Sequence, residues 1–311
     1  MFEVCASMPV LSSCGTFYDI LARRPPAAPA RRFVYLGGML NGRRLGVIGA
    51  GKLGETILGG LFDSGTVERN EVLVTAAHQE RLDVLRERFG VEGTLSNHEA
   101  ALRSDVILLC VKPTTVGRVA EEIAPALGAD KLVVSAAASV TTAFIEARLP
   151  ESVPVVRAMP NTPSRIRKGM TGLAPGSHAT GAHLDMARAL FDAVGRTVVV
   201  DERHLDAITG LSASGPAFIY IVIESLAEGG VKVGLPRDIA TELAAQTVLG
   251  AGAMVLETGE HPAQLKDSVT TPAGCTIDGI LELEEGGLRV TLIKAIVKAT
   301  ERARGLAADA S

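Results

Sequence analysis

Two short stretches hold the residue types that could bind and convert a small molecule. The first is GAGKLG, Gly49 to Gly54, whose glycines have the GxGxxG spacing of a turn that cradles a dinucleotide pyrophosphate. The second is VTTPAGCTIDG, Val269 to Gly279, which has three hydroxyl groups, one carboxylate at Asp278 and no histidine. Backbone amides at a helix N-terminus bind anions, whereas Pro, Gly and Thr clusters also form plain turns. Composition alone therefore leaves the second stretch open between a site and a turn.

The glycine stretch lies where a nucleotide-binding turn must lie. The strand pattern RLGVI precedes it, and the helix pattern ETILGGLFD follows it. In that context the first glycine permits a tight turn, the second lets the backbone approach the pyrophosphate, and the third lets helix and strand pack closely. A glycine-rich turn without a ligand is the alternative. We predict that the cofactor contacts Gly49, Ala50, Gly51, Lys52, Leu53 and Gly54.

The end of the second strand bears on which dinucleotide fits. An NAD site usually has Asp or Glu there to bind the ribose 2′-hydroxyl, but this chain continues from Thr75 to His78 without an acid. That change removes repulsion against a 2′-phosphate. No arginine stands at the strand end, and Arg81 nearby is also consistent with a solvated helix residue. We predict NADPH as the preferred cofactor and NADH as the alternative, with Thr75 and His78 among the contacts.

Strand and helix patterns alternate up to Val200, which predicts a parallel sheet covered by helices on both faces. The strand patterns are RLGVI, EVLVTAA, DVILLCV, KLVVSAAA, VPVVRAM and RTVVV. After Asp201 only helical patterns follow, at residues 204–232, 237–258, 276–285 and 288–304. The expected fold is a Rossmann-like α/β domain at residues 42–200 followed by an all-α domain at residues 201–311.

The first 41 residues differ from the rest of the chain. They include ARRPPAAPARR and show no hydrophobic periodicity, a composition that rarely packs. A disordered arm, a targeting segment and residues upstream of the true start at Met39 are the three interpretations. A secretory signal is not expected, because no charged segment leads into an apolar run with a cleavage site. We favour the disordered arm or the mis-assigned start over an organelle signal, because Met39 comes just before the first clear strand.

Bulk composition narrows the class of protein. Aromatic residues make up 4% of the chain, with no Trp, and the net charge is −4, so a nucleic-acid partner is not expected. No uninterrupted apolar run reaches the roughly 18 residues of a membrane span. The four cysteines show no CxxC spacing and the histidines no metal-ligand spacing, which predicts a cytoplasmic protein without a metal site. We expect the thiols of Cys110 and Cys275 to be buried as small hydrophobic groups.

Seven stretches together resemble the pyrroline-5-carboxylate reductase family. They occur in the family's order and span about Leu45 to Leu306, and the last is the most specific. The stretches are GVIGAGKLGE (46–55), CVKP (110–113), RAMPNTP (157–163), LSASGPAF (211–218), GGVKVGLP (229–236), AAQTVLGA (244–251) and LKDSVTTPAGCTIDGILELEEGG (265–287).

The resemblance implies an activity and assigns roles to residues. The activity is reduction of 1-pyrroline-5-carboxylate to L-proline with NADPH or NADH, the last step of proline biosynthesis. Thr276 would be the catalytic hydroxyl that hydrogen-bonds the substrate ring nitrogen, and Thr271 with the amides of Gly274, Cys275 and Thr276 would hold the substrate carboxylate. The cofactor contacts that it implies are Asn97 at the adenosine ribose and Val111, Lys112, Pro113 and Asn161 at the nicotinamide half.

An iminium substrate suits a site of this composition. An imine carbon accepts hydride once its nitrogen is protonated, so the site needs a carboxylate clamp and good positioning more than a strong acid. Thr276 at the start of a helix could instead be only an N-cap residue. This chain departs from the family pattern at Ala213, Thr271, Ser139 and Phe218, where Gly, Ser, Gly and Tyr are usual. Those departures put the substrate range and turnover in doubt more than the reaction type.

Three other functions compete with this interpretation. A reductase of a related cyclic imine would share every motif. A β-hydroxyacid dehydrogenase would need a GxxxNxxK helix, which the segment after Gly210 lacks. A non-catalytic cofactor-binding regulator would lose the substrate turn, whose two hydroxyls are kept here.

The helical half of the chain also predicts self-association. LSASGPAFIYIVIESLA and ELAAQTVLGAGAMVL are apolar on more than one face, so each needs to be buried on several sides. One small helical domain offers too little interior for both. We therefore expect a homodimer, which the family resemblance also implies, and possible assembly into larger rings.

Overall fold

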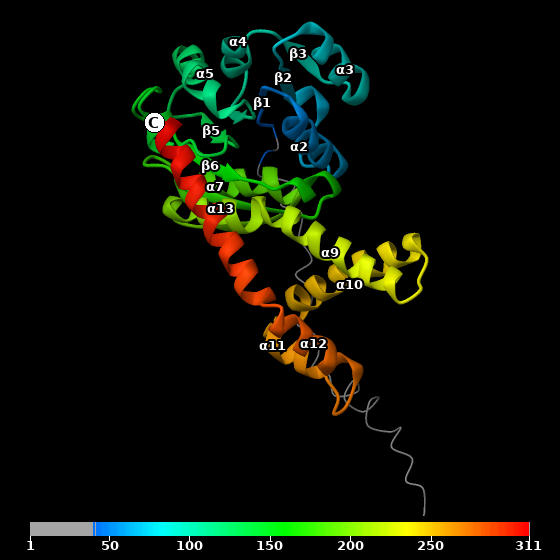
Figure 1. Ribbon diagram of the computed structural model, residues 1–311. Coiled ribbons are helices and arrows are strands. Elements are labelled where there is room, and N and C mark those ends of the chain that lie inside the picture. The colour runs from blue at the N-terminus through cyan, green and yellow to red at the C-terminus, as the bar shows by residue number, and fades with distance from the viewer. Residues whose placement is uncertain (1–39, 41, 311) are drawn as a thin grey trace, which may run out of the picture.

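The computed structural model describes residue 40 and residues 42–310, and Figure 1 shows a sheet domain from which a long helical arm extends. The predicted N-terminal arm, apart from Leu40, lies outside the described residues. The eight strands are β1 (Leu45–Ile48), β2 (Val72–Thr75), β3 (Glu92–Thr94), β4 (Val106–Leu109), β5 (Leu132–Ser135), β6 (Val155–Met159), β7 (Gly169–Pro175) and β8 (Gly195–Val199). Their order in the sheet is β3-β2-β1-β4-β5-β6-β7-β8.

Helices cover both faces of this sheet because neighbouring strand residues point to opposite sides. In β4, Val106 and Leu108 pack into one core cluster, whereas Ile107 and Leu109 pack into the other. The first face is covered by α2 (Lys52–Asp63), α3 (Gln79–Phe89) and α7 (Gly181–Asp192). The second is covered by α4 (Asn97–Leu102), α5 (Val116–Ile123) and α6 (Thr142–Glu146). The predicted Rossmann-like α/β fold is confirmed.

The last two strands depart from the expected parallel arrangement. Strand β7 runs antiparallel to β6, and β8 pairs parallel with β7. A parallel connection needs a crossover of a dozen or more residues. Only the short 3-10 turn η4 (Thr162–Ile166) separates β6 from β7, so the chain turns back on itself. The sequence GMTGLAP of β7 gave no strand prediction, because glycine and proline mask its alternation.

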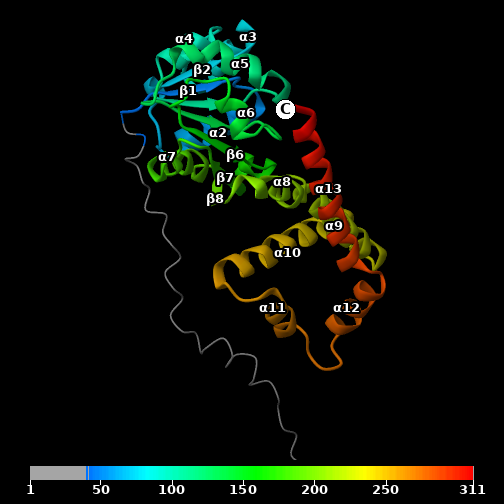
Figure 2. The ribbon, with the colours of Figure 1, turned by 90° about the vertical axis from the view of Figure 1, so that its left-hand side faces the viewer.

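Within the described residues, only helices follow β8. They are the 3-10 helix η5 (Glu202–His204), α8 (Leu205–Ile208), the π-helical segment η6 (Thr209–Ala213), α9 (Gly215–Lys232), α10 (Arg237–Thr258), α11 (Pro262–Ser268), α12 (Cys275–Glu285) and α13 (Leu288–Ala310). Helices α9 and α10 pack on each other around Ala227, Ala240 and Ala244. Helix α13 returns from the far end of the arm to the sheet domain (Figures 1 and 2). There it lies so close to Gly210 that a β-carbon would meet Thr300.

A buried arginine joins the two parts of the chain. Arg157 on β6 is 2% exposed, and its Nη1 donates to a Glu202 carboxylate oxygen at 3.2 Å. The same carboxylate accepts from the backbone N–H and the hydroxyl of Thr142, at 2.8 and 2.7 Å. Glu202 thus ties the start of the helical part to β6 and to the first turn of α6.

The helical arm leaves much apolar surface uncovered in a single chain. Two stretches, Glu202–Lys232 and Arg237–Thr258, have the length and composition of a membrane span, a test that core helices of soluble proteins also pass. Exposed large side chains along the arm include Tyr220, Ile221, Leu243, Leu249, Leu256, Leu281, Val290, Ile293 and Val297. Continuous exposed apolar surface of this kind marks an interaction surface.

Candidate cofactor and substrate site

The first glycine of the cofactor loop is required by both conformation and space. Gly49 has a φ of +79°, a region that residues with a β-carbon rarely adopt. A β-carbon there would lie 2.5 Å from Val111 Cγ1. Thr75 fixes the turn: its hydroxyl accepts from the Gly49 N–H at 3.1 Å, and its carbonyl accepts from the Ala50 N–H at 2.8 Å. The loop is therefore rigidly held at the ends of β1 and β2.

The other two glycines serve different purposes. A β-carbon on Gly51 would meet nothing closer than the Gly49 carbonyl at 3.9 Å, whereas one on Gly54 would lie 3.3 Å from Val47 Cγ1. Gly51 thus leaves open space and Gly54 permits close helix–strand packing. Helix α2 begins at Lys52 and no side chain caps it. Its first-turn N–H groups and positive dipole end suit a phosphate, so the loop fits a dinucleotide pyrophosphate.

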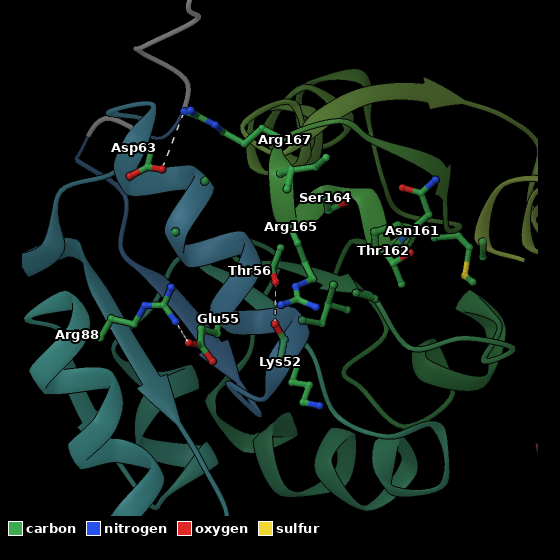
Figure 3. A pocket seen from close by; sticks show the side chains of 18 residues that line it. Lys52, Glu55, Thr56, Asp63, Arg88, Asn161, Thr162, Ser164, Arg165 and Arg167 are labelled. Carbon is green, nitrogen blue, oxygen red and sulfur yellow. Dashed lines mark hydrogen bonds and ion pairs between the residues drawn. The ribbon is translucent and has the colours of Figure 1, made fainter. Parts of the chain in front are cut away.

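A cleft of about 990 Å³ lies beside the start of α2. Helix α2 and the turn η4 form its two sides, and Figure 3 shows Lys52 and Thr56 on one side and Arg165 and Arg167 on the other. Leu53 and Asn161 also line it. In the described part of the chain, neither Lys52 nor Arg165 has a carboxylate partner. The cleft therefore favours an anionic ligand.

Arg81 lies against the cofactor loop instead of pointing into solvent. Its Nε donates to the Ala50 carbonyl at 2.9 Å, and Nη2 donates to the Gly51 carbonyl at 3.2 Å and to Glu55 at 2.5 Å. The side chain is 29% exposed. The hydrogen bond from Arg81 holds the pKa of Glu55 below its usual range. His78 stands exposed just before α3, where it caps no N–H group.

Asn97 lies at the start of α4, within hydrogen-bond distance of Thr75. The Thr75 hydroxyl donates to Asn97 Oδ1 at 2.7 Å, and Asn97 Nδ2 donates to Glu122 at 3.0 Å. Asn97 is partly exposed, so it remains reachable by a ligand above the loop. The sequence indicated the asparagine only through the family resemblance, and nothing in it pointed to Glu122.

The residues expected near the nicotinamide fall into two groups. Val111 packs against Gly49, and Lys112 and Pro113 are exposed beside it at the end of β4. The amide of Asn161 is largely engaged within the protein: Nδ2 donates to the Ser212 carbonyl and hydroxyl, both at 3.1 Å, and Oδ1 accepts from the Met170 N–H at 2.9 Å. Asn161 therefore fastens the turn after β6 to the helical part.

The threonine-rich turn has the geometry of an open helix start. Ala273 has a φ of +57°, and the Gly274 N–H donates to the Thr271 carbonyl at 3.0 Å. Gly274 is the N-cap of α12, with no side-chain cap bond. The N-cap interpretation of Thr276 is therefore wrong, because Thr276 is the second residue of the helix. The amides of its first turn remain available to a carboxylate.

The two cysteines behave differently. Cys275 is exposed in the single chain, which contradicts the expected burial, because α12 packs chiefly against α13 and leaves this side chain open. Burial raises the pKa of the Cys110 thiol to about 12, which excludes a thiolate nucleophile there at neutral pH. Within the described residues, no group of three His, Cys, Asp or Glu side chains could hold a metal ion.

A single chain does not bring the two stretches together. Figures 1 and 2 both place the turn between α11 and α12 at the far end of the arm, away from β1 and the start of α2. The cofactor loop and the threonine turn are therefore two halves that one copy alone leaves separate.

Comparison with known proteins connects both halves to one family. Residues 202–306 match a model described as pyrroline-5-carboxylate reductase dimerisation, and residues 44–139 match one described as NADP oxidoreductase coenzyme F420-dependent. A pyrroline-5-carboxylate reductase of Methanosarcina acetivorans is 42% identical over 86% of this chain and 99% of its own length. One from Synechocystis is 44% identical over 85% of this chain and 98% of its length.

Solved structures agree with the relatives. A pyrroline-5-carboxylate reductase from Coxiella burnetii has a TM-score of 0.81 and 39% identity, covering 85% of this chain and 98% of its own. A Plasmodium falciparum pyrroline carboxylate reductase with NADP bound has a TM-score of 0.75 and 27% identity, covering 86% and 98%. The similarity thus extends over the sheet domain and the helical arm together.

Proposed function

Since this chain belongs to the pyrroline-5-carboxylate reductase family, it reduces 1-pyrroline-5-carboxylate to L-proline by hydride transfer from NAD(P)H, and we propose how its residues divide that work. The reaction is the last step of proline biosynthesis. The chain carries the family's dimerisation region at residues 202–306. The interpretation as a non-catalytic regulator is set aside by this membership.

We propose that the cofactor lies across the Gly49–Gly54 loop. The open space at Gly51 and the uncapped start of α2 support a pyrophosphate there. Asn97 would contact the adenosine ribose, and Val111, Lys112 and Pro113 would border the nicotinamide, which supplies the hydride. Asn161 would support the cofactor site indirectly, because its amide hydrogen bonds hold the turn that lines the cleft.

We propose that NADPH is preferred over NADH. No acidic side chain stands between Thr75 and His78 to repel a 2′-phosphate. The uncapped start of α3 and the guanidinium of Arg81 provide positive potential beside that strand end. Among the described residues, Arg81 Nη1 has no hydrogen-bond partner, so that nitrogen could donate to the 2′-phosphate while Nε and Nη2 hold the loop.

We propose that the threonine turn holds the substrate. Backbone amides of Cys275 and Thr276, together with the Thr271 hydroxyl, would bind the carboxylate at the start of α12. The Gly274 N–H, which donates to the Thr271 carbonyl, would shape the turn instead of binding the substrate. The Thr276 hydroxyl would accept a hydrogen bond from the ring N–H of the iminium and so hold the imine carbon toward the cofactor. The turn then works by positioning the substrate, and no side chain has to change its protonation state.

We propose that a partner copy completes the site and that the protein is a homodimer. The observation that carries this proposal is the distance along the arm between the two halves of the site, combined with the uncovered apolar surface on α9, α10 and α13. A partner's turn could approach the cleft beside α2, while the arms of both copies bury their apolar faces. We place this dimer in the cytoplasm, a compartment that the scattered cysteines support.

The test is an assay of cofactor oxidation with 1-pyrroline-5-carboxylate as substrate. We expect Thr276→Ala to lower kcat/KM for the imine by about tenfold or more, because one hydrogen bond at the reacting ring is lost. Thr291→Ala is the matched control, since that hydroxyl donates to the Gly287 carbonyl at the start of α13. An unchanged kcat/KM in Thr276→Ala would remove the proposed role, and faster turnover of a six-membered imine would point to a related substrate.

A further inference from the structure

We propose that Glu122 on α5 is a positioning residue for the cofactor. It acts through Asn97 and Thr75 and fixes the orientation of the amide that faces the adenosine ribose. This inference rests on the proposed function, in which Asn97 contacts that ribose. Glu122 is exposed on α5 and has no other hydrogen bond in the described part of the chain.

Three hydrogen bonds in series connect Glu122 to the cofactor loop. The Gly49 N–H donates to the Thr75 hydroxyl at 3.1 Å, and the Thr75 hydroxyl donates to Asn97 Oδ1 at 2.7 Å. Asn97 Nδ2 then donates to Glu122 Oε2 at 3.0 Å. We call this series the Gly49–Glu122 relay. It links four elements of the sheet domain that are far apart in the sequence.

The two ends of the relay fix the direction of every bond in it. The Gly49 N–H can only donate, and the ionised Glu122 carboxylate can only accept. Thr75 is 1% exposed, so its hydroxyl hydrogen cannot turn to water and needs the Asn97 oxygen. With Oδ1 held toward Thr75, Nδ2 must face Glu122. The Glu122 carboxylate therefore supplies the hydrogen-bond acceptor that Nδ2 needs in this orientation of the amide.

The fixed amide presents a defined pattern to a ligand. The second Nδ2 hydrogen and the second Oδ1 lone pair of Asn97 remain free for a ligand. Their directions are fixed only as long as the amide cannot rotate. Without the carboxylate, Nδ2 would lose its acceptor and the amide would be free to turn between ligand and protein. The adenosine ribose is common to NADPH and NADH, so the loss should weaken both cofactors by the same factor.

The experiment measures cofactor binding by calorimetric titration of the full-length protein. We expect Glu122→Ala to raise the Kd of NADPH and of NADH about tenfold each, with their ratio unchanged. Glu122→Gln should restore binding to within about twofold of the unmodified protein, because its carbonyl still accepts from Nδ2. Glu121→Ala is the matched control, since that equally exposed neighbour on the same helix faces Arg148 instead.

A double-mutant cycle with Thr75→Val tests whether the relay acts as one unit. The effects of Thr75→Val and Glu122→Ala on the free energy of binding should not add in the double variant. Additive effects, or a Glu122→Ala variant that binds both cofactors like Glu121→Ala, would overturn the proposal. A structural role alone would lower the unfolding temperature of Glu122→Ala and leave Kd unchanged, which also overturns it.

The binding readout separates this inference from the proposed function. If the protein binds cofactor but does not oxidise it with 1-pyrroline-5-carboxylate, the proposed substrate fails while the relay is still tested by Kd. If Asn97→Ala binds both cofactors normally, the ribose contact fails and the relay proposal fails with it.

Discussion

Replacing the first two loop glycines by alanine should separate folding from cofactor binding. Gly49 has a φ of +79°, where a residue with a β-carbon costs about 1–2 kcal/mol. Its new methyl group would lie 2.5 Å from Val111 Cγ1, and relieving such overpacking costs about 1–3 kcal/mol. We therefore expect Gly49→Ala to lower the free energy of unfolding by about 2–5 kcal/mol even without cofactor.

Gly51→Ala should show the opposite behaviour. Gly51 has a φ of −74°, and the nearest atom to a new methyl group is the Gly49 carbonyl oxygen at 3.9 Å. Alanine therefore fits the free protein, and its unfolding temperature should stay unchanged. The methyl group would occupy the space through which a pyrophosphate approaches the backbone. We expect the Kd of NADPH to rise at least about tenfold.

Circular dichroism melting without cofactor and calorimetric titration with NADPH measure the two effects. Gly51→Ala that binds NADPH like the unmodified protein would show that the pyrophosphate lies elsewhere. Gly49→Ala with an unchanged melting temperature would refute the reasoning from backbone strain.

Three further substitutions test other parts of the structure. Arg81→Gln should raise the KM of NADPH about tenfold more than that of NADH. Arg86→Gln, a change at an exposed residue of the same helix, should leave the ratio of the two KM values unchanged. If Arg81→Gln raises both KM values equally, Arg81 does not contact the 2′-phosphate. The pKa of Glu55 is held below its usual 4.5 by Arg81, so its ion pair stabilises the fold above that pH and is lost as the pH falls through the lowered value. The difference in unfolding temperature between the unmodified protein and Glu55→Gln should therefore shrink as the pH falls below the usual 4.5, and a difference independent of pH would contradict this. The ammonium of Lys131 donates to three carbonyls at the end of α4, at 2.9, 3.0 and 2.5 Å, so Lys131→Met should lower the free energy of unfolding in urea by roughly 1–2 kcal/mol. Lys298→Met, whose ammonium is mostly exposed, is its control.

Motifs with a fixed local geometry could be predicted from the sequence. GAGKLG predicts its own turn, because Gly49 adopts a positive φ that glycine permits. Gly54 allows α2 to pack against Val47, which lies only seven residues earlier in the sequence. The long periodic helices α9 and α10 also followed from their pattern. Strand β7 could not be predicted, because its place depends on the short turn η4 and on pairing with β6.

Contacts between distant segments could not be predicted either. The positions of Arg81 and Glu122 follow from how α3 and α5 pack beside the loop, and no local pattern encodes that packing. The burial of Cys275 was inferred from its residue type, whereas its exposure depends on the extension of the arm away from the sheet domain. These misses share one cause: the site is assembled from tertiary contacts that lie outside any short sequence window.

Complementation between two impaired variants, assayed at limiting cofactor and substrate, tests most directly whether the site is shared by two copies. Gly51→Ala damages only the cofactor half, and Thr276→Ala damages only the substrate half. If each site combines the loop of one copy with the turn of its partner, a mixed dimer contains one intact site. Refolding an equal mixture should then restore about a quarter of the unmodified activity, since half of the dimers are mixed. Activity no higher than the average of the two separate variants would contradict a shared site and show that each chain completes its own.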